Sequence, residues 1–322
     1  MKRLRLLAAG LAAGLLLAAC GQGSGSGDPE TYPSDQIRLI VPYVAGGPTD
    51  IAARTLGRYM EADLGQSVVV ENLPGASGTT AYQEMLSADA DGYTLSMTAL
   101  PTAVLNYLSN DVGYTREDFA PVGVITQVPS ALVVPAASPY ADLEALFADA
   151  RANPQKVTVA TPGATNTHAA ETRRITQLYD VPLTVVPFNG NQEVLTALLG
   201  GNTVAGFVNV SQDMLPSIEN GDLRVLAVGT QERLPYIDAP TFVEQGYPEL
   251  TQSTTTFGVI APAGTPEPVI ARLEETMRAA SSDPEVVKAL DERYVPEEFL
   301  GSADLAELFA QTEETFRDVA GG

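Results

Sequence analysis

The sequence has little of the chemistry on which most catalytic and metal sites depend, with one cysteine and one histidine among its 322 residues. A single cysteine forms no internal disulfide, and a single histidine cannot build a His-rich metal site. Neither Gly-x-Ser-x-Gly nor the phosphate-binding Gly-x-x-x-x-Gly-Lys-Ser/Thr motif occurs after residue 20. The sequence therefore predicts no enzyme, no cofactor and no metal site, and a catalytic triad using His168 is only a formal alternative.

Positive charge is also scarce. The chain has 18 Lys and Arg residues against 40 Asp and Glu residues, which gives a formal net charge of -22 at pH 7. Nucleic acid and anionic lipid surfaces are poor partners for such a chain. After the first few residues only two lysines remain, Lys156 and Lys288. Net charge alone does not identify a ligand.

Long apolar runs are missing, since the run from Leu6 to Ala19 is too short to span a bilayer and none longer follows. It lies behind a basic start and before Leu17-Ala18-Ala19-Cys20, which resembles the bacterial lipobox. We predict a lipoprotein signal peptide over residues 1–19, lipidation of Cys20, and a flexible Gly/Ser tether over residues 20–28. This predicts an extracytoplasmic protein with a lipid anchor in the cell membrane, on the periplasmic side or at the outer cell surface. Acylation also removes Cys20 as a partner for histidine.

The sequence does contain a glycine-rich turn between a predicted strand (residues 37–41) and a predicted helix (residues 49–63). If Gly47 is the N-cap and Pro48 the first helical residue, the next two N–H groups have no partner in the helix. Gly46 and Gly47 lack the Cβ atoms that would keep a ligand away, and the helix dipole favours an anion there. A carboxylate can then dock without Lys or Arg. The structural alternative is a tight turn only.

Asp50, the third residue of that helix, has two interpretations. Its carboxylate can reach back and cap Gly47, or it can pair with the amine of an amino-acid ligand. A second turn, with Thr165, Asn166 and Thr167 before another predicted helix, is similarly ambiguous, because these side chains either cap the helix or contact a ligand. His168 follows at a helix start, where a neutral hydrogen-bonding or packing histidine is expected.

Strands alternate with helices along the whole chain, which predicts parallel sheets with ligands at the carboxyl ends of the strands. One series runs from residue 37 to residue 128 and a second from residue 131 to residue 228, with a crossing at Pro129-Ser130 and a return over residues 231–252. The first series includes a strand over residues 93–98, and the second includes helices over residues 167–179 and 211–220. Helices at 266–281, 284–291 and 303–319 are expected to pack back on the first series. We predict two α/β lobes with a ligand cleft between them. Their predicted extents are residues 29–125 with 246–322 for lobe 1 and 126–245 for lobe 2.

Seven ordered stretches resemble the substrate-binding proteins of tripartite tricarboxylate transporters, the Bug family, over most of residues 32–319. They are Tyr32-Pro33, the 42–54 loop and helix start, and the segments 70–78, 91–95, 186–190, 223–228 and 261–266. The resemblance implies a type II-like periplasmic-binding-protein fold that closes on a small organic carboxylate held largely by main-chain N–H groups. It implies that the turns 42–50 and 161–168 contact the carboxylate. It also implies delivery to membrane permease subunits, by a protein expected to be a monomer.

Two departures from the family pattern concern the ligand. The second turn carries bulkier residues than usual, at Ala164, Thr165 and Asn166, and an Asp often found on a later strand is replaced by residues 204–206, with Asn209 at the strand end. The alternative function is a ligand-sensing surface lipoprotein that signals to a sensor kinase. Both functions use the same expected ligand contacts: Tyr43, Gly46, Gly47, Thr49, Asp50, Ser77, Thr98, Thr165, Asn166, Thr167, Asn189 and Asn209.

Overall fold

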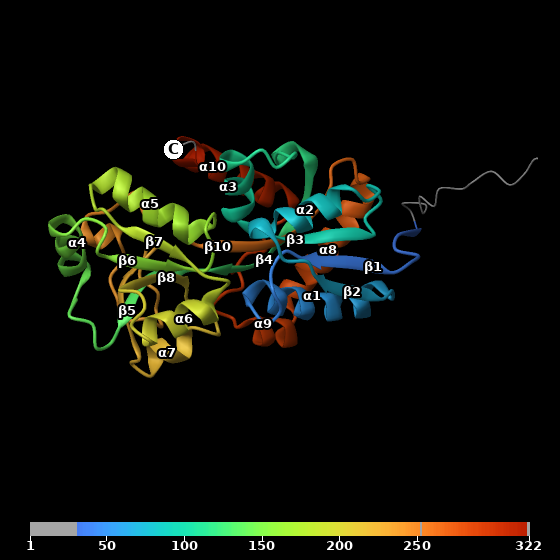
Figure 1. Cartoon of the computed structure of the whole chain (residues 1–322). Coiled ribbons are helices and arrows are strands. Elements are labelled where there is room, and N and C mark those ends of the chain that lie inside the picture. Colours follow the sequence, from blue (N-terminus) through green and yellow to red (C-terminus); the bar gives the residue numbers. More distant parts are fainter. Residues whose placement is uncertain (1–30, 252, 321–322) are drawn as a thin grey trace, which may run out of the picture.

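The computed structural model describes residues 31–251 and 253–320. Two lobes lie side by side, and each has a five-stranded sheet flanked by helices (Figure 1). The predicted signal peptide, Cys20 and the tether lie outside the described residues. Within the described ranges, no helix combines the length and the apolarity that crossing a membrane requires.

The sheet of lobe 1 has the order β2-β1-β3-β10-β4. Its strands are β1 (Ile37–Val41), β2 (Val68–Asn72), β3 (Thr94–Leu100), β4 (Phe119–Val128) and β10 (Thr255–Pro262). As expected, β1 is parallel to β2 and β3. The expectation of a parallel sheet is wrong for β10, which is antiparallel to both of its neighbours. This strand re-enters the sheet from lobe 2, so it runs in the opposite direction.

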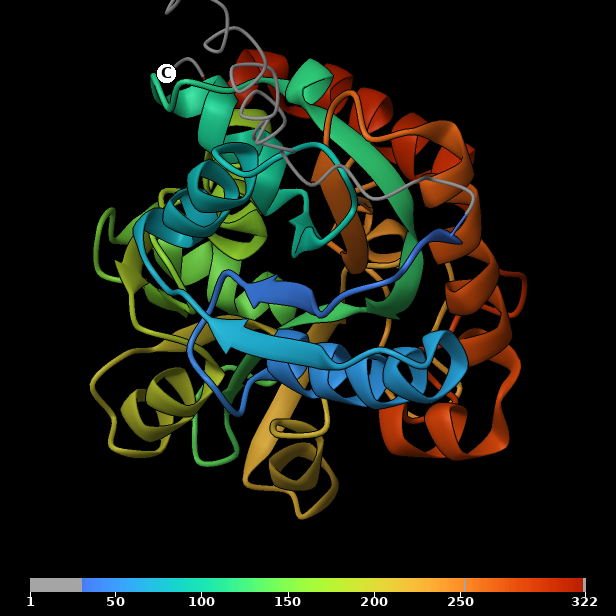
Figure 2. The ribbon, with the colours of Figure 1, turned by 90° about the vertical axis from the view of Figure 1, so that its right-hand side faces the viewer.

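Helices cover both faces of this sheet (Figure 2). They are α1 (Pro48–Leu64), α2 (Thr79–Leu86), α3 (Thr102–Ser109), α8 (Glu267–Ser282), α9 (Pro284–Leu290) and α10 (Ser302–Ala320), with short 3-10 turns η2 (Ala76–Gly78) and η3 (Arg116–Asp118). The apolar sides of α1, α8 and α9 share one core cluster, and those of α2, α3 and α10 share another. The C-terminal helices therefore pack on lobe 1, as their apolar spacing predicted.

The sheet of lobe 2 has the order β7-β6-β8-β5-β9, in which β5 is antiparallel to both neighbours. Its strands are β5 (Ser130–Pro135), β6 (Thr158–Thr161), β7 (Thr184–Pro187), β8 (Ala205–Asn209) and β9 (Leu223–Val228). Its helices are α4 (Leu143–Ala152), α5 (Thr167–Tyr179), α6 (Asn191–Leu199), α7 (Leu215–Glu219) and the turn η4 (Val243–Gln245). This lobe repeats the plan of lobe 1.

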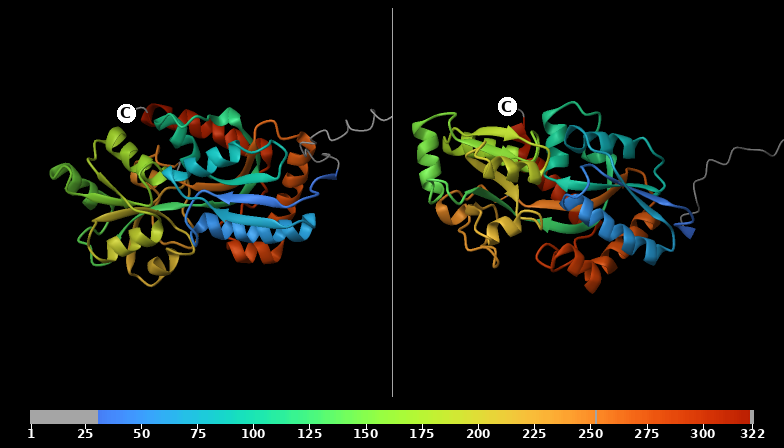
Figure 3. Two further views of the ribbon diagram at one scale, coloured as in Figure 1. Left: turned by 45° about the vertical axis from the view of Figure 1, so that its right-hand side comes forward. Right: turned by 60° about the horizontal axis from the view of Figure 1, so that its bottom comes forward.

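The chain crosses between the lobes at Pro129, as expected, because β4 pairs in the first sheet as far as Val128 and β5 begins the second at Ser130. A division at residues 125 and 126 would therefore cut β4. The return crossing also falls later than residue 246, since Tyr247 and Leu250 still pack in the core of lobe 2. Further views of the two lobes show these connections (Figure 3).

Candidate functional site

A cavity of about 470 Å³ lies between the lobes. It is large enough for a small organic molecule, and its walls come from both lobes. Lobe 1 contributes residues 42–49 and 74–78 with Ala99 and Thr102. Lobe 2 contributes 188–192 with Pro162, Gly163, Asn166, His168, Asn209 and Asp213, and β10, in the sheet of lobe 1, contributes Thr255 and Phe257.

Four helices point their N-termini at this cavity. Their N-caps, Gly47 of α1, Gly78 of α2, Asn166 of α5 and Gly190 of α6, all line it. Three of these caps are glycines, which have no side chain that could cap the first N–H groups of the helix. Because the first N–H groups of a helix have no intrahelical acceptor, these ends supply donors and a positive potential in the cavity.

The end of α1 has the geometry expected from the sequence. Gly47 is its N-cap, with φ -85° and ψ 173°, and Pro48 is its first residue. A Cβ atom on Gly47 would meet nothing closer than the Val44 carbonyl oxygen at 4.0 Å. Within the described part of the chain, the N–H groups of Thr49 and Asp50 have no recorded acceptor. The loop therefore presents free donors in a conformation that needs no glycine at position 47.

Asp50 lies beneath this loop and shapes it. The residue is 4% exposed. Its Oδ2 accepts from Gly46 N–H at 3.0 Å and from Arg54 Nε at 3.0 Å, and its Oδ1 accepts from Asn72 Nδ2 at 2.9 Å. Burial opposes ionisation, but Arg54 and the other donors hold the pKa of Asp50 below its usual range. The Asp50 carboxylate was expected to reach back to Gly47, but it accepts from the N–H of Gly46 instead. Both of its oxygens already accept hydrogen bonds from neighbouring residues, so it is not available to a ligand amine.

The second turn was expected to cap a helix or to contact a ligand, and its residues differ in which of these roles they can serve. Asn166 lines the cavity, and its Oδ1 caps α5 by accepting from Ala169 N–H at 3.0 Å. Thr165 instead donates to Ser77 Oγ across the cleft at 2.7 Å. The Thr167 hydroxyl lies 3.5 Å from that of Thr102, also in lobe 1. These two threonines therefore join the lobes and do not line the cavity.

His168 belongs to a buried polar network beside the two chain crossings. Its Nε2 lies 3.0 Å from Ser130 Oγ and 3.2 Å from Asn209 Oδ1, which also accepts from Thr255 at 2.9 Å. The Ser130 hydroxyl donates to the Ser253 carbonyl, so it accepts from an Nε2–H of the imidazole. Burial lowers the pKa of His168 to about 4. The imidazole is therefore neutral at pH 7, as expected from the sequence.

Eight of the twelve expected ligand contacts line the cavity: Tyr43, Gly46, Gly47, Thr49, Ser77, Asn166, Asn189 and Asn209. Asp50, Thr165 and Thr167 lie behind it for the reasons above. Thr98 was expected at a strand end, but β3 continues to Leu100 and Thr98 pairs with Gly258 inside the sheet. A strand that pairs with a later segment extends beyond its own apolar pattern.

Several lining residues were missed by the sequence analysis. Asn191 and Gln192 open α6, and Thr102 opens α3, a helix that was not foreseen. Asp213 lies in a turn because α7 begins at Leu215, whereas a helix was expected from residue 211. The sequence feature that could have identified these residues is a polar side chain in the first turn of a helix or just after a strand. Ligands of α/β proteins bind at these positions.

No Lys or Arg side chain lines the described cavity, and its one histidine is neutral. Burial also raises the pKa of Tyr43, so its phenol stays protonated. Within the described ranges, no three His, Cys, Asp or Glu side chains lie close enough together to hold a metal ion. The cavity can therefore hold an anion through N–H, amide and hydroxyl donors.

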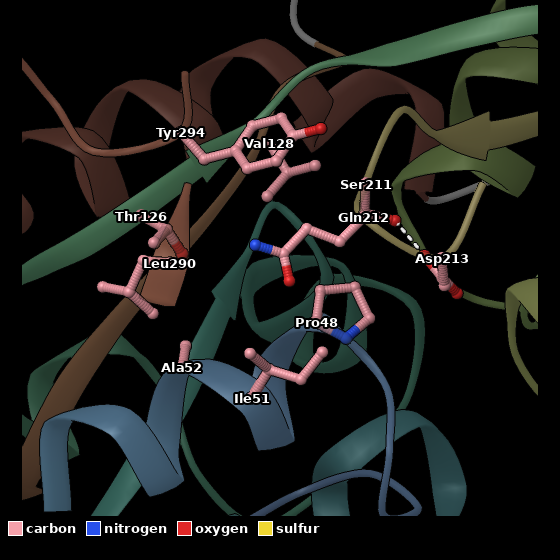
Figure 4. Close-up of a pocket in the computed structure, with 10 residues that line it drawn as sticks. All are labelled: Pro48, Ile51, Ala52, Thr126, Val128, Ser211, Gln212, Asp213, Leu290 and Tyr294. Carbon is pink, nitrogen blue, oxygen red and sulfur yellow. Dashed lines mark hydrogen bonds between the residues drawn. The ribbon is translucent and has the colours of Figure 1, made fainter. Parts of the chain in front are cut away.

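A second pocket of about 20 Å³ adjoins the cavity where α1 faces lobe 2 (Figure 4). Its walls are mostly apolar, with Ile51 and Leu290 on the side of lobe 1. The Gln212 amide of lobe 2 donates to the Ala289 carbonyl of lobe 1 at 3.3 Å. The pocket has room for about one water molecule, so we do not assign it a ligand.

Two α/β lobes around a cavity with convergent helix N-termini define a bilobed solute-binding protein. The chain belongs to the family described as the tripartite tricarboxylate transporter family receptor, whose model matches residues 52–318. The sequence resemblance to this family is confirmed. Because the family consists of transport receptors, the expectation that this protein is not an enzyme is also confirmed.

Individual relatives agree with this assignment. BugT of Bordetella pertussis is 35% identical over 268 residues, which cover 81% of this chain and 80% of the relative. MatC from Rhodopseudomonas palustris, solved with bound malate, has a TM-score of 0.79 and 28% identity, covering 90% of this chain and 100% of that one. Rpa4515 from R. palustris, solved with adipate, has a TM-score of 0.81 and 29% identity, covering 90% and 97%. The expected periplasmic-binding-protein fold is confirmed.

Proposed function

We propose that this protein is an extracytoplasmic solute-binding lipoprotein that captures a small organic carboxylate for a tripartite tricarboxylate-type membrane transporter. The observation that carries the proposal is the convergence of four helix N-termini on one cavity, where no cationic side chain is found among the described lining residues. Such a site favours an anion that accepts several hydrogen bonds, and a carboxylate offers two oxygens for them.

The ligands of relatives support the choice of a carboxylate, since malate is bound to MatC and adipate to Rpa4515. In this chain, the free N–H groups at the start of α1 dock the carboxylate on lobe 1. Rotation of lobe 2 then brings the N-termini of α5 and α6 to the ligand and excludes water, which strengthens each N–H···O⁻ bond. Hydroxyl contacts such as Thr165 to Ser77 hold the lobes together in this state.

Delivery follows from closure. The closed lobes present a surface that membrane permease subunits distinguish from the open one, and acyl chains on Cys20 keep the protein beside them. The tether over residues 20–28 isolates the lobes from the anchor. Replacement of Cys20 by Ser should abolish the incorporation of labelled fatty acid while ligand binding stays unchanged. Continued labelling of this variant would contradict the anchor.

A thermal-shift screen of mono-, di- and tricarboxylates tests the proposed binding function. A ligand present at 100 times its Kd adds about 2.7 kcal/mol to the free energy of unfolding, so at least one acid should raise the Tm clearly. The screen should include malate and adipate, and a neutral sugar serves as the control. If no organic acid raises the Tm, the carboxylate function is contradicted.

A further inference from the structure

We infer that Asp213 makes this cavity selective for ligands that carry an ammonium group close to the carboxylate, an inference that rests on the proposed function. Asp213 lies in the turn between β8 and α7 and lines the cavity. It is the one acidic side chain among the described lining residues, and it is only partly exposed.

The charge of Asp213 has no cationic partner in the described part of the chain. Its Oδ1 accepts from the Ser211 hydroxyl and, at 3.4 Å, from Asn191 Nδ2, and both of these donors are neutral. No Lys, Arg or His nitrogen lies within ion-pair distance of it among the described residues. Oδ2 accepts no recorded hydrogen bond from those residues. The fixed carboxylate therefore keeps one oxygen for a further donor.

Asp213 lines the same part of the cavity as the N-terminus of α1. Asp213 and Pro48, the first residue of α1, line the cavity together, and they also share the pocket of about 20 Å³ beside it (Figure 4). Both residues therefore line the same end of the cavity. A ligand carboxylate at the start of α1 thus faces a wall that includes Asp213 of the opposite lobe. An ammonium group on the adjacent carbon would pair with Asp213, whereas a second carboxylate there would be repelled.

The hydrogen bonds within lobe 2 account for only one oxygen of this carboxylate, Oδ1. Asp213 precedes α7, but the N-cap of that helix is Met214, and no side chain caps it. Among the described residues, no backbone N–H donates to Asp213. Ser211 and Asn191 orient its side chain from two segments of lobe 2, so the carboxylate is held in place at the cavity wall.

Two pairs of probes that differ only by an α-amino group test the inference by calorimetry. They are adipate with 2-aminoadipate, and hexanoate with 2-aminohexanoate. We expect the amino acid of at least one pair to bind wild-type protein about tenfold or more tightly than its parent acid, the factor that one well-placed charge pair supplies. Asp213→Asn should abolish this advantage without weakening the parent acid. Asp222→Asn, the same change at an exposed site in lobe 2, serves as the control.

The outcomes separate the two claims. If the parent acids bind as tightly as their amino analogues, or if Asp213→Asn leaves the preference unchanged, the inference is overturned and the carboxylate function stands. If none of the four probes binds, the inference is overturned, and if the wider acid screen is also negative, the carboxylate function fails with it.

Discussion

At the scale of single residues, the site depends on buried side chains that hold the cavity wall in place. Asp50 fixes the Gly46 loop from beneath, and His168 links the cavity wall to both chain crossings. The sequence placed Asp50 among the ligand contacts, because it follows a glycine-rich turn, and it predicted a neutral hydrogen-bonding or packing role for His168. It could not separate a supporting role from direct contact, since that depends on which direction each side chain takes in the folded chain.

The buried histidine gives a prediction about pH. In the unfolded chain the pKa of His168 is near its ordinary 6.5, whereas burial lowers it to about 4 in the folded protein. Between these values the unfolded state binds more protons, so stability rises with pH and is lost as the pH falls. From pH 7 to pH 5 this one residue should cost about 2 kcal/mol of the free energy of unfolding.

Denaturant unfolding of His168→Gln at the two pH values checks this account. The variant cannot titrate, and its amide keeps a donor for Ser130 and Asn209. Its stability should therefore fall by about 2 kcal/mol less than that of the wild type between pH 7 and pH 5. Equal losses in the two proteins would show that the imidazole is not held neutral by burial.

At the scale of elements, local sequence patterns located most strands and helices. The strand Ile37–Val41 and the helix Thr167–Tyr179 coincide with their predicted spans, because an apolar run and a capping residue mark them. The antiparallel direction of β10 and the helix α3 had no such local signal, since both depend on contacts with distant segments. The start of α7 at Leu215 also had no local signal. Because a helix was expected from residue 211, Asp213 was not recognised as a residue of a turn that lines the cavity.

A helix of lobe 1 also packs against lobe 2 outside the two crossings. The helix α10 belongs to lobe 1, but Phe316 near its end is fully buried against Ala170 of α5 and Leu105 of α3. The Arg174 guanidinium of α5 also lies over its ring, 5.3 Å from the centroid. Replacement of Phe316 by Ala should lower the free energy of unfolding by about 3 kcal/mol, because it removes a buried aromatic ring and leaves a cavity.

Chemical denaturation measures this loss, with Leu178→Ala as the matched control. Leu178 lies on α5 and is 50% exposed, so its truncation should change stability by less than about 0.5 kcal/mol. Similar small effects for both variants would mean that α10 does not hold the lobes together.

At the scale of the whole molecule, the sequence was enough to predict two α/β lobes and a cavity between them. Repeated strand-turn-helix units gave the architecture, and ordered family motifs gave the class. The composition of the cavity wall was less accessible, because it depends on how two separately folded lobes approach each other. Asp213 and Asn191 become neighbours of the α1 loop only through that approach.

The central claim is that main-chain N–H groups at the start of α1 hold the ligand carboxylate. Calorimetry on Gly47→Asp tests it most directly, using whichever acid binds the wild type. An N-cap Asp fits the extended backbone at this position, and its own carboxylate would occupy the Thr49 and Asp50 N–H groups. Gly47→Ala adds a Cβ into open space, and the double variant Lys156→Ala and Lys288→Ala removes the two lysines that follow the signal region. We predict a folded Gly47→Asp protein, at least as stable as wild type, that has lost measurable binding, with near-normal affinity in both controls. Normal affinity in Gly47→Asp, or loss of binding in the double lysine variant, would contradict the account.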